Sequence, residues 1–218
     1  IGANLERSKL SGANAMRADF TDAILKDAKL VRANLKQANM NGANLSGADL
    51  SGADLAGADL RDAVLVGAHT QSCKFDGARM DGVLTDTPSG KGPADLAMAQ
   101  MLRDHALWCE TQGAEGKPSK FDEADLRSLG SISGFNLTAL SAKGAVFYGL
   151  DMEGVQLQGA HLEGADLRNS NLKRADLRGA RLKNAKLSGA NLGEAQMGPL
   201  NLGQDRLLPC DLTGATVK

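Results

Sequence analysis

His105 and Trp108 form the pair in this sequence that most resembles a functional site, because the single Trp lies three residues after a His. The apolar residues Met98, Met101 and Leu102 precede the pair at helical spacing, so His105 and Trp108 also continue the buried stripe of one helix. We favour this structural interpretation. We predict that all five side chains pack the helix and that the pair carries no activity.

Carboxylates recur at a fixed spacing of five residues, as in Asp49, Asp54 and Asp59. Asn takes the same place in the pattern at Asn39 and Asn44, and an amide cannot transfer protons as a carboxylate does. Asp and Asn share the ability to hydrogen-bond backbone groups two residues on. We therefore predict a turn-bonding role for this position and no acid or base catalysis.

Other reactive groups are isolated in the sequence. The cysteines Cys73, Cys109 and Cys210 have neither paired nor metal-ligand spacing. His69 and His161 have no carboxylate or thiol partner at a suggestive spacing, and motifs for a nucleophile elbow or a phosphate loop are absent. The sequence predicts no catalytic residue, no cofactor and no bound metal, and hence a protein that is not an enzyme.

The element that positions these residues is a repeat of five, a period that belongs neither to a strand nor to a helix. Positions 5 to 80, taken every fifth residue, hold Leu, Phe or Met in 14 of 16 slots, and the positions two residues earlier hold Ala in 14 of 16. A second array has its large residues at positions 137 to 217, where 16 of 17 slots are Leu, Phe, Met or Val. Each repeat thus has one large and one small buried side chain.

The pattern A-(D/N)-L-x-x, as in residues 43–47 and 165–169, resembles the pentapeptide repeat family. The resemblance implies an all-β fold, a right-handed quadrilateral β-helix in which each repeat forms one side and four repeats form one coil. Residues twenty apart would then stack. Gly42, Gly47, Gly52, Gly57 and Gly154 occupy the fifth position, as do Gly159 and Gly164, and we expect positive φ angles there.

Between the arrays the repeat is interrupted. We expect a linker and one α-helix from Ala94 to about Gln112, with Pro93 in its first turn and a stop at Gly113. The predicted organisation is a first array at 1–86, a linker and helix at 87–118, and a second array at 119–218. The two arrays are either stacked or consecutive.

Two irregularities mark the beginning of the second array. The register of the repeat shifts by one residue near Leu129 and Gly130, where we predict a bulge. Bulky residues replace Ala at Phe135, Leu140, Leu150 and Val155. They either adapt the coil to the helix or are simply tolerated.

A cationic belt is the strongest charge feature of the second array. Five-residue spacing distributes these side chains around roughly one coil, and Glu153 and Glu163 lie one coil below Lys173 and Lys183. Both a solvated surface with cross-coil pairs and a surface for an acidic partner remain open. The candidate partner-binding residues are Arg168, Lys173, Arg174, Arg178, Arg181 and Lys183.

Two functions follow from the repeat and its resemblance. The first is a non-enzymatic structural scaffold that binds a protein partner. The second is implied by the resemblance alone: some family members mimic duplex DNA, bind a type II topoisomerase such as gyrase and protect it from inhibitors. Net charge of −1, with 10 basic and 11 acidic residues in 1–87, argues against that mimicry and against direct nucleic-acid binding. A polysaccharide-active enzyme would need aromatic platforms and clustered carboxylates on one side, and the single Trp108 in the expected helix disfavours it.

The sequence also bears on membrane association, cellular location and self-association. No apolar run approaches the length of a transmembrane helix. Unpaired cysteines favour a reducing, cytoplasmic compartment, but the sequence begins at Ile1 without Met, as a trimmed or processed chain would, so an extracytoplasmic location stays open. End-to-end or helix-mediated self-association is also open, because solenoid ends must be covered.

Overall fold

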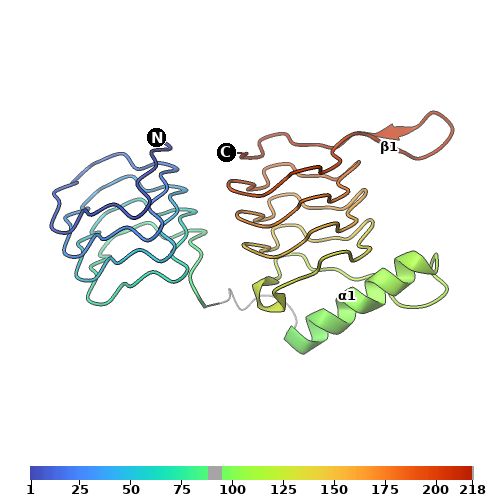
Figure 1. Ribbon diagram of the computed structural model, residues 1–218, viewed down its shortest axis with the longest axis horizontal. Helices are drawn as coiled ribbons and strands as arrows, with labels where there is room; N and C mark the ends of the chain where they lie inside the picture. The colour runs from blue at the N-terminus through green and yellow to red at the C-terminus, as the bar shows by residue number, and fades with distance from the viewer. Residues whose placement is uncertain (88–94, 218) are drawn as a thin grey trace. The chain divides into compact units, whose positions relative to one another are not determined.

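The structure is a computed structural model that describes residues 1–87 and 95–217, and it divides into two units, Ile1–Thr87 and Pro88–Lys218. Each unit is a stack of coils with its own buried core (Figure 1). The named elements lie in the second unit: α1 (Asp95–Glu110), the 3₁₀ helix η1 (Arg127–Leu129), β1 (Leu200–Asn201) and β2 (Leu207–Leu208). The helix predicted between the arrays is confirmed; Pro93 and Ala94, its predicted start, lie outside the described residues.

Parallel β-bridges between residues twenty apart hold the first unit together. Ile24 pairs with Asn44, and the Leu25 N–H donates to the Asn44 carbonyl at 2.7 Å. Four repeats of five therefore separate one layer from the next, and parallel strands stand about 4.8 Å apart. The β-helix predicted from the repeat is confirmed in its stacking and its period.

The core of the first unit consists of the two predicted inward positions. Leu25 and Leu45 stack in one column and are fully buried, as are Ala23 and Ala43 beside them. Because each repeat contributes one Leu-sized and one Ala-sized side chain, few aromatic residues can be accommodated. This explains the scarcity of aromatic residues in the composition.

The turns use Asp and Asn as predicted. Asp49 Oδ1 accepts hydrogen bonds from the Ser51 N–H at 3.0 Å and from the Ser51 hydroxyl at 2.6 Å. These bonds hold the pKa of Asp49 below its usual value, so the group is an ionised acceptor and a poor general acid. The second turn residue has positive φ, 68° at Gly52, as expected for the fifth position. Arg32 adopts the same region at 56°.

The one-residue register shift of the second unit lies at η1. Lys120 and Asp125 pair with residues twenty-one positions later, whereas Ser131 pairs with Asp151, twenty positions later. The extra residue is taken up by the 3₁₀ turn, which Gly130 ends at a φ of 67°. The predicted position of the shift is confirmed, but the predicted bulge is wrong because a helical turn absorbs the residue.

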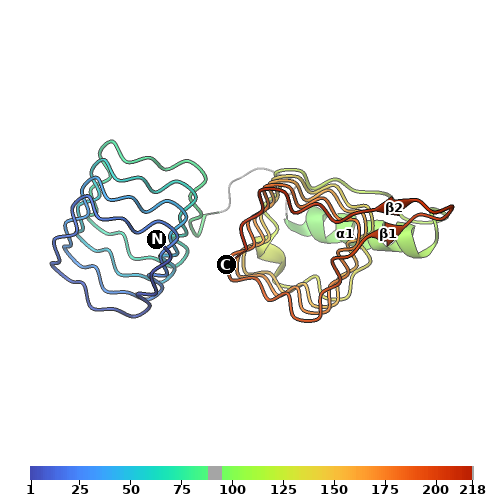
Figure 2. The same cartoon turned by 90° about the horizontal axis from the view of Figure 1, so that it is seen from above.

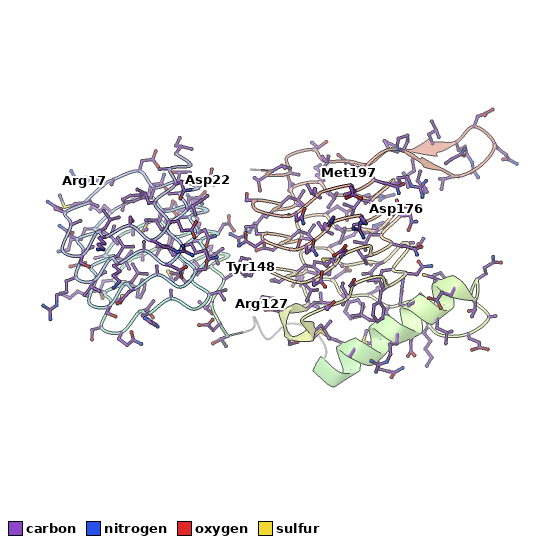
Figure 3. The ribbon with its side chains drawn as sticks, in the orientation of Figure 1. Arg17, Asp22, Arg127, Tyr148, Asp176 and Met197 are labelled. Atoms are coloured by element: carbon purple, nitrogen blue, oxygen red, sulfur yellow. The ribbon has the colours of Figure 1, made fainter. Side chains whose placement is uncertain are left out.

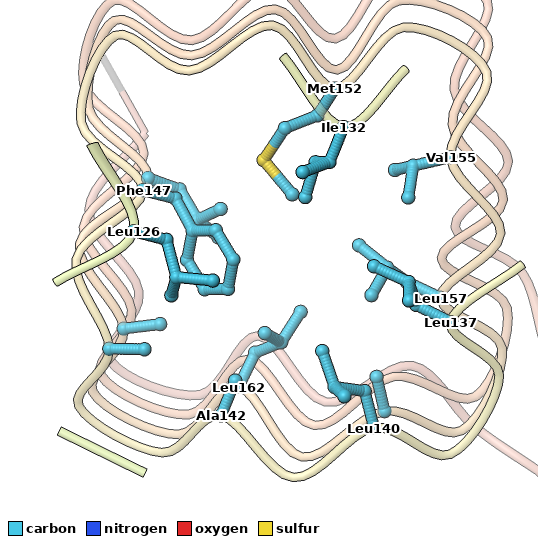
Figure 4. Close-up of a cluster of buried hydrophobic side chains, with 14 of the residues drawn as sticks. Leu126, Ile132, Leu137, Leu140, Ala142, Phe147, Met152, Val155, Leu157 and Leu162 are labelled. Atoms are coloured by element: carbon cyan, nitrogen blue, oxygen red, sulfur yellow. The ribbon is translucent and has the colours of Figure 1, made fainter. Parts of the chain in front are cut away.

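At Leu140, one of the bulky residues in small slots, the repeat exchanges its large and small side chains. Leu140 occupies a small slot, and the large slot two residues later holds Ala142; both are fully buried and project into the space that the chain surrounds (Figure 4). Leu150 and Val155 are buried as well, and the bridges keep their spacing of twenty from Ser131 to Gln196. Because Leu140 and Ala142 together fill the same volume as an Ala and a Leu in the usual order, the strand pairing stays intact.

The end of the second array differs from the prediction. Arg181 pairs with Asp211, thirty residues later, because β1 and β2 form a two-stranded hairpin that projects from the coil. Leu202 and Leu207 occupy slots predicted to point inward, yet they are 50% and 60% exposed. The continuous repeat predicted to 217 is therefore wrong at the hairpin. The ten extra residues equal two repeats, so Leu212 resumes the pattern in phase.

None of the helices within the described residues has the length and apolar character needed to cross a membrane.

Candidate functional site

Helix α1 lies across the first coil of the second unit (Figure 1). Met98 and Leu102 are buried in the same core as Phe121 and Leu126, and Met101 packs partly against it. The apolar stripe of the helix therefore covers the end of the core. This cover prevents the first coil from presenting its apolar interior to solvent.

His105 joins the helix to the coil through both ring nitrogens. Its Nδ1 accepts a hydrogen bond from the Ser119 N–H at 3.0 Å, so the ring proton is on Nε2 and is donated to the Thr138 carbonyl at 3.1 Å. The side chain is 2% exposed, and burial lowers its pKa, an effect that the Thr138 carbonyl offsets only in part. His105 is a neutral structural bridge, and within the described residues its ring nitrogens bond to backbone groups and not to a carboxylate.

A groove of about 320 Å³ lies between α1 and the first coil. Trp108 and Cys109 line it from the helix, and Asn136, Thr138 and Ala139 line it from the coil, with Gln112 beyond the end of α1. The Cys109 thiol is 3.6 Å from the Thr138 carbonyl, and burial raises its pKa, so it is a weak nucleophile. Cys109 is the one thiol in the lining of the groove, and catalysis is not indicated there.

Two members of the cationic belt are held within their own repeats. Arg168 Nε donates to Asp166 at 2.8 Å, and Arg178 Nε donates to Asp176 at 2.9 Å (Figure 3 shows Asp176). The Asp176 carboxylate raises the pKa of Arg178. Arg168 is 6% exposed, which corrects its assignment to a binding surface: the neighbouring carboxylate holds the guanidinium against the coil.

A short motif in the sequence marks these pairs. The chain contains D-L-R four times, and Arg follows Asp by two residues at each place. In all four the Arg Nε donates to that Asp, because the Arg lies in the first turn position beside the bridge residue: Arg61 to Asp59, Arg127 to Asp125, Arg168 to Asp166, and Arg178 to Asp176. Arg in this motif is a turn residue.

The other members of the belt divide into paired and unpaired groups. Arg174 lies 3.3 Å from Glu153 and 3.4 Å from Glu194, and Lys173 lies 4.0 Å from Glu194. Glu153 thus pairs with Arg174 and not with Lys173 as predicted, because the turn carries the longer guanidinium toward both neighbouring coils.

The side chains of Arg181 and Lys183 are exposed and, among the residues that the structure describes, form neither a hydrogen bond nor an ion pair, although the Lys183 charge helps to lower the pKa of Asp211. The expected partner of Lys183, Glu163, instead places Oε1 3.8 Å from His161 Nδ1, a neighbour that spacing did not suggest for His161. Of the six predicted surface residues, Arg181 and Lys183 are the ones left free to meet another molecule.

The base of the hairpin rests on two glycines at one corner of the coils. A Cβ on Gly179 would stand 2.8 Å from Leu200 Cβ and 3.1 Å from Leu208 Cδ2, and a Cβ on Gly159 would stand 3.8 Å from both leucines. The absence of a side chain at Gly179 is therefore what allows the hairpin to lie against the corner.

Gly179→Ala is expected to displace the hairpin and to destabilise the second unit by about 2 kcal/mol, since it combines a steric clash with a positive φ of 68°. Tryptic cleavage after Arg206 in the hairpin turn, measured beside thermal unfolding, should accelerate. Gly149→Ala is the matched control, because Gly149 has the same φ and open space around it. Equal cleavage rates in the two variants would contradict the anchoring role.

No group of three or more His, Cys, Asp or Glu side chains is arranged for a metal ion in the described part of the chain. The sites found are therefore surfaces: a helix-covered coil, a groove, a hairpin and a pair of free cations.

Eight copies of the family model for pentapeptide repeats match this chain, at residues 1–37, 28–67, 43–82 and 156–193. These ranges cover more than half of the sequence, and the chain belongs to the pentapeptide repeat family, with its right-handed β-helix fold. No curated protein matches.

Several solved structures are similar to it. A pentapeptide repeat protein from Nostoc PCC 7120 is 43% identical over 34% of this chain and 62% of its own, with a TM-score of 0.34. QnrB1, a plasmid-mediated fluoroquinolone resistance protein, is 19% identical over 100% of this chain and 89% of its own, with a TM-score of 0.34. HetL, a pentapeptide repeat protein involved in heterocyst differentiation regulation in Nostoc sp. PCC 7120, is 23% identical over 98% and 86%, with a TM-score of 0.25.

Proposed function

We propose that this chain is a non-enzymatic scaffold that binds a protein partner through the sides of its coils. The proposal rests on how the polar side chains are used. Asp49 and His105, which could react, are hydrogen-bonded to turn and backbone groups, whereas the side chains of Arg181 and Lys183 are exposed and form no ion pair within the described residues. A β-helix fixes the spacing of such side chains before binding, which reduces the entropy lost on association.

We also propose that each array, 1–86 and 119–218, is a closed, four-sided right-handed coil. Segment 87–118 connects the two arrays as a linker and helix. The bridges between residues twenty apart support the four-sided coil, and the separate buried cores support two arrays.

The partner is an acidic protein segment. Arg181 occupies a bridge position and Lys183 the following corner, so both cations extend from adjoining parts of one coil. Contact with a carboxylate of the partner costs less free energy for Arg181 and Lys183 than for Arg178, because Arg178 must first break its hydrogen bonds to Asp176.

Affinity capture from an extract of the source cell tests this function. The wild-type chain should retain an acidic protein, and the double variant Arg181→Glu with Lys183→Glu should retain at least tenfold less of it. Lys9→Glu with Lys26→Glu is the matched control, since these exposed lysines of the first unit give the same change in net charge. Equal loss in both variants would contradict the assigned face, and no enriched protein would contradict the scaffold.

The alternative function is binding to a topoisomerase as a mimic of duplex DNA. The outward columns of the first unit disfavour it, because Asp49 lies between Lys29 and His69, and Lys74 follows Asp54. Such mixed columns lack the continuous negative charge of a DNA backbone. A gyrase supercoiling assay with a quinolone should show no protection by this chain; protection would favour the alternative.

A further inference from the structure

We propose that two copies of this chain associate through one side of the second unit, where the hairpin leucines of each copy enter the groove beside Trp108 of the other. This self-association is separate from the partner-binding face at Arg181 and Lys183.

The hairpin presents apolar side chains that its own unit does not cover. Leu200 and Leu208 face the glycine corner, so strand alternation places Leu202 on the same face farther out, and Leu207 on the opposite face. Leu202 and Leu207 are 50% and 60% exposed. Large apolar side chains on a projecting element are typical of a contact with another molecule.

The groove suits such side chains. Its volume of about 320 Å³ lies near the lower limit of ligand pockets, so it can accept one or two side chains but not a helix. Several of its polar groups are already engaged: Asn136 Oδ1 accepts from the Thr138 hydroxyl at 2.8 Å, and the Thr138 carbonyl accepts from His105. Trp108, Cys109 and Ala139 remain as its available surface.

Hairpin and groove lie at opposite ends of the same side. Figures 1 and 2 agree that the hairpin and the second half of α1 project from the second unit in the same direction, the hairpin from the last coil and α1 beside the first. A two-fold axis perpendicular to that side exchanges the two ends. Each hairpin then meets the other copy's groove, and the two identical contacts close the assembly as a dimer.

Charge does not oppose this arrangement. The hairpin turn carries Asp205 and Arg206, both exposed, and the described side chains of α1 include exposed Arg103, half-buried Asp104 and exposed Glu110. These helix side chains carry more negative than positive charge, so Arg206 of a second copy can form an opposite-charge contact with Glu110 at the rim.

Sedimentation velocity of the full chain tests the dimer. We expect a concentration-dependent dimer, and at least tenfold weaker association when Leu202→Ser and Leu207→Ser are combined, since two buried leucines are lost from each contact. Leu212→Ser is the matched control because Leu212 is also exposed, at 37%, but lies on the last coil outside the hairpin.

Trp108 reports directly on the groove because it is the single Trp. Its emission should shift to longer wavelength as the wild-type dimer is diluted, and the double leucine variant should show the shifted spectrum at every concentration. A chain that is monomeric throughout, a dimer unaffected by the leucine changes, or an emission independent of concentration would each overturn the proposal. So would a monomer whose groove binds an unrelated apolar peptide.

Discussion

Leu162→Ala is expected to lower the free energy of unfolding of the second unit by about 3 kcal/mol. Leu162 is fully buried and stacks between Ala142 and Leu182, because His161 pairs with both Ser141 and Arg181 (Figure 4). The substitution creates a cavity, and the small side chain of the neighbouring Ala142 cannot fill it. The main chain is held by bridges on both sides and cannot collapse into it.

Differential scanning calorimetry measures this change. The transition of the second unit should fall by roughly 10 °C, while that of the first unit stays in place. Leu55→Ala is the matched control, since Leu55 is equally buried but belongs to the separate core of the first unit. A single transition that both variants lower equally would contradict independent cores.

His105→Ala is expected to destabilise the attachment of α1 by about 3 kcal/mol. The substitution leaves the Ser119 N–H and the Thr138 carbonyl without the ring nitrogens that satisfy them, and each unsatisfied buried group costs about 1–3 kcal/mol. It also removes a ring that packs beside Trp108, with centroids 5.8 Å apart. The helix should separate from the first coil before the remaining coils unfold.

The same bridge makes the stability depend on pH. In the unfolded chain His105 titrates near pH 6.5, and burial lowers its pKa in the folded state. The unfolded state therefore binds protons more readily, so stability is complete above about pH 6.5 and declines as the pH falls below it. Protonation puts a second donor on Nδ1, opposite the Ser119 N–H, and the hydrogen bond is lost.

Urea unfolding followed by far-UV circular dichroism and Trp fluorescence at several pH values distinguishes these effects. The wild-type protein should lose stability below pH 6.5, and His105→Ala should be less stable but should lack that part of the pH dependence. His161→Ala is the control, because His161 is partly exposed on a coil side. Unchanged pH dependence in the His105 variant would show that another group is responsible.

Local physical chemistry explains why much of this fold could be predicted from the sequence. The inward Leu and Ala positions, the Asp and Asn turns and the fifth-position glycines depend on contacts within one repeat. The stacking of Leu25 on Leu45 then follows from the period of twenty. The stripe of α1 was also visible, because helical spacing places Met98 and Leu102 on one face.

Less of the candidate site could be predicted from the sequence. A cationic belt could be recognised, but spacing alone could not tell Arg168, which is buried on Asp166, from Arg181, which is exposed. The D-L-R motif holds that information once the turn geometry is known. The groove beside Trp108 could not be predicted, since it depends on how α1 crosses the coil at Asn136 and Ala139.

The sequence by itself determined the repeat, the family and the residues that fill the core, because these arise from neighbours five and twenty residues apart. Only the tertiary structure decided where the repeat leaves the coil. Leu202 and Leu207 satisfy the pattern as well as Leu187 does, yet they form a hairpin. An insertion of two whole repeats preserves the register, so the pairings of Arg181 with Asp211 and of Lys186 with Thr216 are what distinguish a projecting hairpin from another buried layer.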